Sequence, residues 1–156
     1  MLFELGLVPA LEWLADEMRR LYDLQISVID EGVKKQLDTS ISTILFRAVR
    51  ELLINVAKHA KVSRAKVTIQ RRSQQITIQV MDEGIGLNRP VRTKPSKKRG
   101  AEGFGLLSMR ERLSYIGGEM RIESVPGDGT LVTLIAPWRL THVYRRRKND
   151  DSGPIG

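Results

Sequence analysis

The segment "RELLINVAKHA", Arg50 to Ala60, decides the fold, because it ends the longest predicted helix of the chain and carries polar residues along its apolar side. At about 100° per residue, the apolar positions of this helix recur with helical spacing and share one face. These positions are Ile41, Ile44, Leu45, Ala48, Leu52 and Val56. Asn55 falls near the centre of the same face, where an amide needs a hydrogen-bonding partner or a ligand.

Three further polar residues lie near Asn55 at helical spacing: Glu51 one turn before it, and Lys58 and His59 about one turn after it. One interpretation is structural, with the amide held by backbone groups of its neighbours. The other is a Mg²⁺ shared with a nucleotide polyphosphate, because Mg²⁺ prefers oxygen ligands and is bound jointly by protein and substrate phosphates. Asn55 then supplies an oxygen, Glu51 acts on a coordinated or attacking group, and Lys58 meets phosphate charge. His59 either meets phosphate or only ends the helix.

The composition is that of one globular domain. The chain has 156 residues, of which 41% are hydrophobic and 28% charged. The net charge of +8 suggests nucleic acid, anionic lipid or phosphate as ligands, or basic loops that are merely solvated. The absence of cysteine excludes disulfides and thiolate metal sites. With no signal peptide and no apolar run of about 18 residues, the expected location is cytoplasmic, and a membrane anchor elsewhere in a full-length protein is left open.

Hydrophobic periodicity predicts an alternation of helices and strands along the rest of the chain. The predicted helices are 7–22, a helix from near 38–40 to 59, and 106–116, which ends at Gly117 and Gly118. The predicted strands are 24–30, two strands of a hairpin within 65–82, 119–125 and 130–137. This order predicts an α/β (α+β) two-layer sandwich, in which a mixed, mostly antiparallel sheet of about five strands carries three main helices on one face. We expect one domain over 1–144 and a disordered polar tail over 145–156.

The segment "EGIGLNRPVRTKPSKKRGAEGFG", 83–105, has no hydrophobic period and is rich in glycine, proline and basic residues. Loops of this length inside a compact domain are usually functional lids or disordered segments, and we expect a mobile lid over 87–102. Its basic residues are Arg89, Arg92, Lys94, Lys97, Lys98 and Arg99. Their charge either attracts phosphates and steers a partner or keeps the loop solvated; we favour solvation with some steering.

Three short glycine motifs flank this segment or follow it. "DEGIG", 82–86, places a carboxylate where a strand ends and lets backbone approach a ligand closely. "GFGL", 103–106, lies directly before a predicted helix, where free amide groups can bind an anion. "GDGT", 127–130, is a hairpin turn that needs no ligand. Each motif alone is also explained by an ordinary turn or helix start.

Together and in this order, "RELLINVAKHA", "DEGIG", "GFGL" and "GDGT" resemble the asparagine box and glycine boxes of the GHKL ATPases. This superfamily includes DNA gyrase, the ninety-kilodalton heat-shock chaperone, sensor histidine kinases and MutL. The resemblance covers roughly 5–138 and implies a Bergerat-type ATP-binding fold. The segment 103–137 most resembles sensor histidine kinases that signal to response regulators with helix-turn-helix output domains. The opening "ELGLVPALEWLADEM" is similar to the linker before the catalytic domain in those kinases.

The resemblance implies ATP and Mg²⁺ as cofactors and assigns roles to individual residues. Asn55 coordinates Mg²⁺, Asp82 accepts a hydrogen bond from the adenine amino group, and Thr130 closes the adenine side. Glu51 occupies the position often assigned to the base or to a metal-bound water. The adenine pocket is shaped by Gly84 and Gly86. The phosphates are met under the lid by Gly103, Gly105 and the amide of Leu106.

One feature departs from the family pattern, because such kinases carry the phosphoacceptor histidine on a helix before the catalytic domain. The chain has only His59, within the asparagine box, and His142, beyond the last strand. The resemblance therefore implies a catalytic domain that transfers the γ-phosphoryl of ATP to a histidine on a separate dimerisation domain and cannot phosphorylate itself. The implied partners are the phosphoacceptor helices of the same full-length kinase and, indirectly, a response regulator. No specific nucleic acid is expected.

Two other functions fit parts of the sequence. A stand-alone serine kinase of the anti-sigma type shares the ATP fold, but the opening segment resembles a kinase linker instead. A basic nucleic-acid-binding module fits the charge of +8. The basic residues lie in loop and tail, and Phe104 is the one aromatic residue near the end of the lid, so a base-stacking surface is not indicated.

Overall fold

The computed structural model describes residues 6–33, 37–59, 62–83, 100–125 and 129–140, without the side chains of 100–104 and 125. Its elements in chain order are α2 (Leu7–Tyr22), β1 (Gln25–Gly32), α3 (Thr39–His59), β2 (Arg64–Arg71), β3 (Gln75–Asp82), α4 (Gly100–Tyr115), β4 (Glu119–Val125) and β5 (Gly129–Pro137). The predictions for Gly84, Gly86, the tail over 145–156 and residues 87–99 of the lid lie outside the described residues. The lid was predicted over 87–102, but residues 100–102 lie in α4, so its predicted end was wrong.

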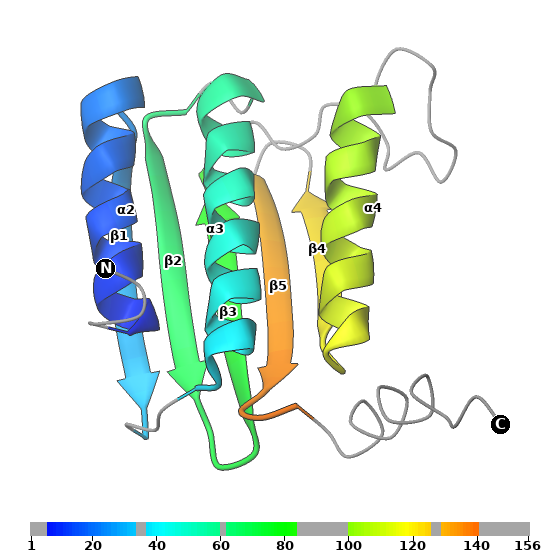
Figure 1. Ribbon diagram of the computed structural model, residues 1–156. Helices are drawn as coiled ribbons and strands as arrows, with labels where there is room; N and C mark the ends of the chain where they lie inside the picture. The colour runs from blue at the N-terminus through cyan, green and yellow to red at the C-terminus, as the bar shows by residue number, and fades with distance from the viewer. Residues whose placement is uncertain (1–5, 34–36, 60–61, 84–99, 126–128, 141–156) are drawn as a thin grey trace, which may run out of the picture.

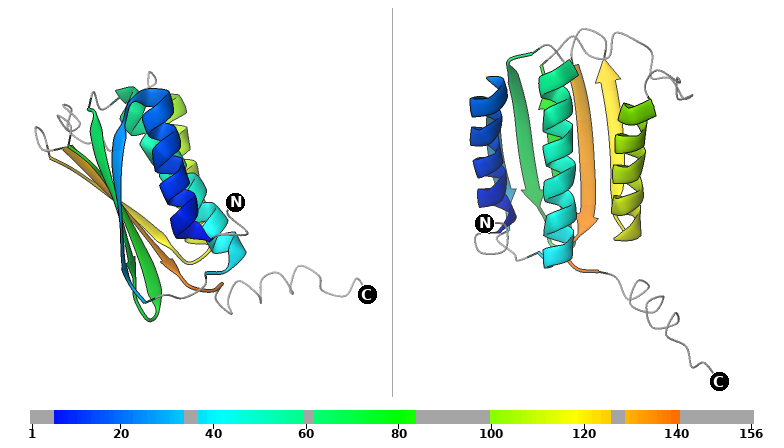
Figure 2. Two further views of the ribbon diagram at one scale, coloured as in Figure 1. Left: turned by 90° about the vertical axis from the view of Figure 1, so that its left-hand side faces the viewer. Right: turned by 45° about the horizontal axis from the view of Figure 1, so that its top comes forward.

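The five strands form one mixed sheet in the order β1-β2-β3-β5-β4. The β1 and β2 strands pair in parallel, and the remaining neighbours pair antiparallel. The helices α2, α3 and α4 lie side by side on one face of this sheet (Figures 1 and 2). The predicted two-layer fold is therefore confirmed.

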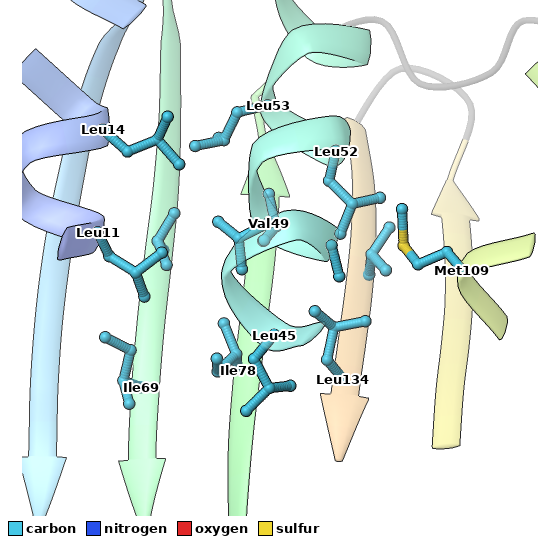
Figure 3. Packing of buried hydrophobic residues seen from close by; sticks show 14 of the residues in the cluster. Leu11, Leu14, Leu45, Val49, Leu52, Leu53, Ile69, Ile78, Met109 and Leu134 are labelled. Atoms are coloured by element: carbon cyan, nitrogen blue, oxygen red, sulfur yellow. The ribbon is translucent and has the colours of Figure 1, made fainter. Parts of the chain in front are cut away.

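The core lies between the helices and the sheet. Alternate residues of β2 and β3 point into it, so Ile69 and Ile78 are fully buried, and Ile78 lies close to Leu45 of α3 (Figure 3). The other face of these strands carries half-buried polar residues such as Thr68 and Gln79. No helix in the described part of the chain is long and apolar enough to cross a membrane.

The end of β5 is tied back to the start of α3. Asp38, directly before the helix, accepts a hydrogen bond at Oδ2 from the backbone N–H of Leu140, with an N···O distance of 3.1 Å. The backbone N–H of Asp38 in turn donates to the carbonyl of Trp138 at 3.2 Å. Asp38 thus links two segments that are far apart in the sequence.

The third predicted helix ends as expected but begins earlier. Gly117 has φ +81° after α4, and the N–H of Gly118 donates to the carbonyl of Leu113 at 2.7 Å, which confirms the double-glycine stop. However, α4 begins at Gly100 and not at Leu106, so the predicted start was wrong. Ala101 and Glu102 are both residue types of high helix propensity, which favours this earlier start.

Candidate functional site

Residues that the sequence analysis singled out come together at one end of the molecule, the upper end in Figure 1. The last turns of α3, the end of β3, the start of β5 and the first turns of α4 meet there. The antiparallel pairing of β3 with β5 brings Asp82 opposite Thr130. Segments that are distant in the sequence thus become neighbours at this end.

Asp82 is the last residue of β3 and one of the two polar or charged residues buried among those the structure describes. Strand alternation places its side chain on the same side of the sheet as Ile78 and Val80, so its carboxylate points toward the helices. Its Oδ1 accepts a hydrogen bond from the backbone N–H of Thr130, with an N···O distance of 3.3 Å. Since a buried carboxylate is stable only when hydrogen-bonded, this contact helps to hold Asp82 in the interior.

Gly129 packs directly against Asp82 and was not predicted as a site residue. It is buried, has φ +96°, and begins β5. A Cβ atom here would overlap the carbonyl oxygen of Asp82 and lie 3.2 Å from its Oδ1. The sequence signal was the glycine immediately before Thr130 in "GDGT", which was interpreted only as a turn.

Asn55 lies at the edge of the buried face of α3 and not at its centre, so that part of the prediction was wrong. The buried positions include Val49 and Leu53, so the centre of the buried face lies roughly a quarter turn away from Asn55. The side chain of Asn55 is consequently half-buried. Glu51, one turn earlier, is also half-buried on the same edge of the helix.

Glu51 shows which way this polar edge of α3 faces. Its Oε1 lies 2.5 Å from the position that a Cβ atom would take on Gly105 of α4. The absence of a side chain at Gly105 therefore lets the carboxylate reach the backbone of α4. The edge of α3 that carries Glu51 and Asn55 accordingly faces α4.

The remaining predicted residues lie around the same end. Lys58 and His59, the last two residues of α3, are exposed, so His59 is not part of the core. Leu106 is half-buried and packs against the core. Gly103 and Leu106 lie within α4, so the prediction that "GFGL" precedes the helix was wrong. Gly103 remains among the first four residues, whose amides have no partner within a helix, whereas the amide of Leu106 is placed to bond within it.

Two surface ion pairs outside the candidate site each lower the pKa of a glutamate side chain. A hydrogen bond from Arg20 lowers the pKa of Glu17 on α2, and one from Arg121 lowers the pKa of Glu119 on β4. Glu119 begins β4 opposite Ile135, at the end of the sheet far from Thr130. Neither pair contains a predicted site residue, and surface pairs of this kind contribute little to stability.

The arrangement can bind a nucleotide. Asp82 offers a buried acceptor at the sheet, Asn55 an amide oxygen, and Lys58 a positive charge, all at the same end of the molecule. An amide oxygen is a suitable ligand for Mg²⁺ when phosphates and water complete the coordination. In the described part of the chain, no three His, Cys, Asp or Glu side chains are arranged to hold a metal ion.

Comparison with known proteins identifies the family of this domain. The model of the histidine kinase-, DNA gyrase B- and HSP90-like ATPase family matches residues 40–140. An uncharacterized sensor-like histidine kinase from Chloroflexus aurantiacus is 32% identical over 149 residues, covering 88% of this chain and 24% of the relative. The signal transduction histidine-protein kinase/phosphatase DegS from Brevibacillus brevis is 30% identical over 134 residues, covering 86% of this chain and 33% of DegS.

Solved structures support the same fold. The blue-light activated histidine kinase of Erythrobacter litoralis EL346 superposes with a TM-score of 0.64 at 18% identity, over 85% of this chain and 45% of the kinase. The histidine kinase domain of the same protein gives a TM-score of 0.63 at 18% identity, over 85% of this chain and 61% of that domain. At this identity, the superpositions establish the shared fold.

Proposed function

Because the chain belongs to the histidine kinase-, DNA gyrase B- and HSP90-like ATPase family, we propose that it is the ATP-binding catalytic domain of a two-component sensor histidine kinase. The observation that carries the proposal is the meeting of Asp82, Thr130, Asn55 and Glu51 at one end of the fold, beside Gly105. The chain spans about a quarter to a third of the length of the curated relatives it matches. The phosphoacceptor helices of the full-length kinase are therefore proposed as its partners, with a response regulator as the indirect recipient.

The described residues fit the two ends of an ATP molecule. The buried carboxylate of Asp82 accepts a hydrogen bond from the adenine amino group, and Thr130 lines the same side. Gly84 and Gly86 are proposed to complete the adenine pocket. The triphosphate extends toward the edge of α3 that faces α4, where Lys58 supplies positive charge and Gly103, Gly105 and the amide of Leu106 are proposed to approach it.

Asn55 is proposed as the protein ligand of a Mg²⁺ that arrives with the nucleotide. Its amide oxygen is of the ligand type that Mg²⁺ prefers, and its half-buried place beside Glu51 restricts its motion. When bound, the metal neutralises charge that builds up on the phosphates during transfer. His59, exposed at the end of α3, is proposed either to contact phosphate or only to end the helix.

The transfer step forms a bond between an imidazole nitrogen of the acceptor histidine and the γ-phosphorus. The bond between that phosphorus and the bridging oxygen breaks, and ADP leaves. Glu51 is proposed to accept the imidazole proton, because its carboxylate lies at the phosphate end of the site, beside Gly105. Proton acceptance by a positioned side chain typically contributes about 10²- to 10⁴-fold to the rate.

The proposal is tested by incubating the chain with γ-labelled ATP and a phosphoacceptor-helix fragment of a sensor histidine kinase. We expect label on the fragment in an acid-labile, base-stable form, as for phosphohistidine, and no label on the chain itself. A parallel reaction replaces the fragment with an anti-anti-sigma protein. Acid-stable label on serine of that protein, with none on the helix fragment, would contradict the histidine kinase assignment and support the serine kinase instead.

We predict that Gly105→Ala separates stability from catalysis. The new Cβ would lie 2.5 Å from Oε1 of Glu51, so the flexible carboxylate has to move. Alanine is also the better helix former, by up to about 1 kcal/mol, so the free energy of unfolding should stay level or rise. Phosphotransfer should fall roughly 10- to 100-fold, because misplacing a catalytic group by about 1 Å can cost 10²-fold.

The control for Gly105→Ala is the same change in a Glu51→Ala background. If Gly105 acts by making room for Glu51, the second substitution should cause no further loss of rate, because the two residues form one unit. Additive losses in the two variants would contradict this interpretation. Thermal or urea unfolding of all variants measures whether the free energy of unfolding stays level or rises.

A further inference from the structure

The start of β5 approaches the end of β3 more closely than a side chain would permit. Gly129 is buried with φ +96°, and its missing Cβ would overlap the carbonyl oxygen of Asp82. The same Cβ would stand 3.2 Å from Oδ1 of Asp82, which is tighter than ordinary van der Waals contact. A side chain at position 129 would thus overlap the backbone of Asp82 and crowd its carboxylate.

The close approach of β5 to β3 places Thr130, the residue after Gly129, where it can bond the carboxylate of Asp82. Thr130 pairs with Asp82 across β3 and β5, and its backbone N–H donates to Oδ1 at 3.3 Å. A backbone donor within a paired strand has little freedom, so it fixes the direction of the carboxylate better than a flexible side chain would. The geometry at Gly129 is therefore a condition for this hydrogen bond.

We infer that Gly129 is a positioning residue for nucleobase recognition and acts through Asp82. It allows β5 to approach close enough for the Thr130 N–H to orient the carboxylate toward an amino group of the ligand. The inference rests on the proposed function, in which Asp82 meets the adenine amino group. It adds that discrimination between purines depends on a residue that does not itself touch the base.

The test compares ATP with inosine triphosphate, which carries a carbonyl in place of the amino group, in equilibrium binding to the full chain. Wild type should prefer ATP. In Gly129→Ala the preference should fall about tenfold, which corresponds to the loss of one oriented, charge-assisted hydrogen bond. Affinity for inorganic tripolyphosphate with Mg²⁺ should be unchanged, since the phosphate end of the site is not altered.

Gly32→Ala provides a matched control at the far end of the sheet. Gly32 also has positive φ, +107°, and a Cβ there would overlap the carbonyl oxygen of Arg71 on the paired strand. The substitution therefore strains the sheet in the same way as Gly129→Ala, but far from Asp82. We expect a comparable loss of stability with the preference for ATP intact.

A second variant keeps the inference testable if Gly129→Ala does not fold. Replacing Thr130 by its α-hydroxy acid turns the amide into an ester and removes the N–H that bonds Asp82, without adding an atom at Gly129. The preference for ATP should then fall about fivefold. An unchanged preference in the ester variant would overturn the inference.

The outcomes separate this inference from the proposed function. If wild type prefers ATP and Gly129→Ala keeps the full preference, the role of Gly129 is overturned and that of Asp82 stands. If wild type binds ATP and inosine triphosphate equally, the proposed contact of Asp82 with adenine fails, and the inference fails with it. If Gly32→Ala loses the preference as strongly as Gly129→Ala, the effect comes from general strain in the sheet and the inference is overturned.

Discussion

Replacing Asn55 with alanine is expected to lower the affinity for ATP at least about 100-fold in the presence of Mg²⁺. Removal of a residue that merely orients a metal ligand typically costs 10- to 100-fold in metal affinity, and Asn55 is proposed as a direct ligand. Isothermal titration with ATP and Mg²⁺ measures the change. In EDTA, wild type and Asn55→Ala should bind ATP with similar low affinity, because the lost interaction needs the metal.

The control for Asn55→Ala is Gln79→Ala. Gln79 is also a half-buried amide, but it lies on the sheet face opposite the helices, since its neighbours Ile78 and Val80 point into the core. Its removal should leave the titration unchanged. If Asn55→Ala retained the full dependence of ATP binding on Mg²⁺, Asn55 would not be the metal ligand, and its place at the edge of α3 would be structural.

Asp82→Asn is expected to weaken ATP binding about 10- to 100-fold and to reverse the preference between purines. A hydrogen bond to a charged group contributes about 1.5–3 kcal/mol, and each 1.4 kcal/mol corresponds to a factor of ten. The asparagine oxygen can still accept from the Thr130 N–H, which turns the new amide NH₂ toward the base. That group repels the amino group of adenine but donates to the carbonyl of inosine, so inosine triphosphate should bind relatively better.

Asp38→Asn serves as the matched control for this prediction. Asp38 also accepts a hydrogen bond from a backbone N–H, that of Leu140 at 3.1 Å, but it lies at the start of α3, at the opposite end of the helix from Asn55. Nucleotide preference should not change in this variant. Retention of the ATP preference in Asp82→Asn would exclude Asp82 as the adenine acceptor, while far-ultraviolet circular dichroism verifies that both variants fold.

The fold could be predicted closely because each element carries its own local signal. Buried apolar residues at helical spacing mark α2 from Leu7 to Tyr22, as predicted, and strict alternation marks the hairpin of β2 and β3. The double glycine at the end of α4 is equally local. Where a local signal was ambiguous the prediction failed, since glycines in the first turns of α4 suggested a loop although the residues between them favour a helix.

The family and the candidate residues at the site were also available from the sequence, because the order of the four motifs is itself a linear pattern. Their arrangement was only partly predictable. Helical periodicity placed Asn55 on the face containing Leu45 and Leu52, but the direction in which that face points depends on which residues the sheet buries. Burial of Val49 and Leu53 rotated the face and left Asn55 at its edge, beside α4.

The sequence by itself determined most of the elements, the family and the candidate polar residues of the site, since these follow from periodicity, motif order and residue type. Tertiary structure alone decided the distances between them. Two close approaches join segments that are remote in the chain: Gly105 to Glu51, and Gly129 to Asp82. Each is possible because glycine has no side chain. Glycine leaves no signal in the hydrophobic periodicity. Its role in close packing is evident only from the neighbouring residue that occupies the space where a Cβ atom would lie.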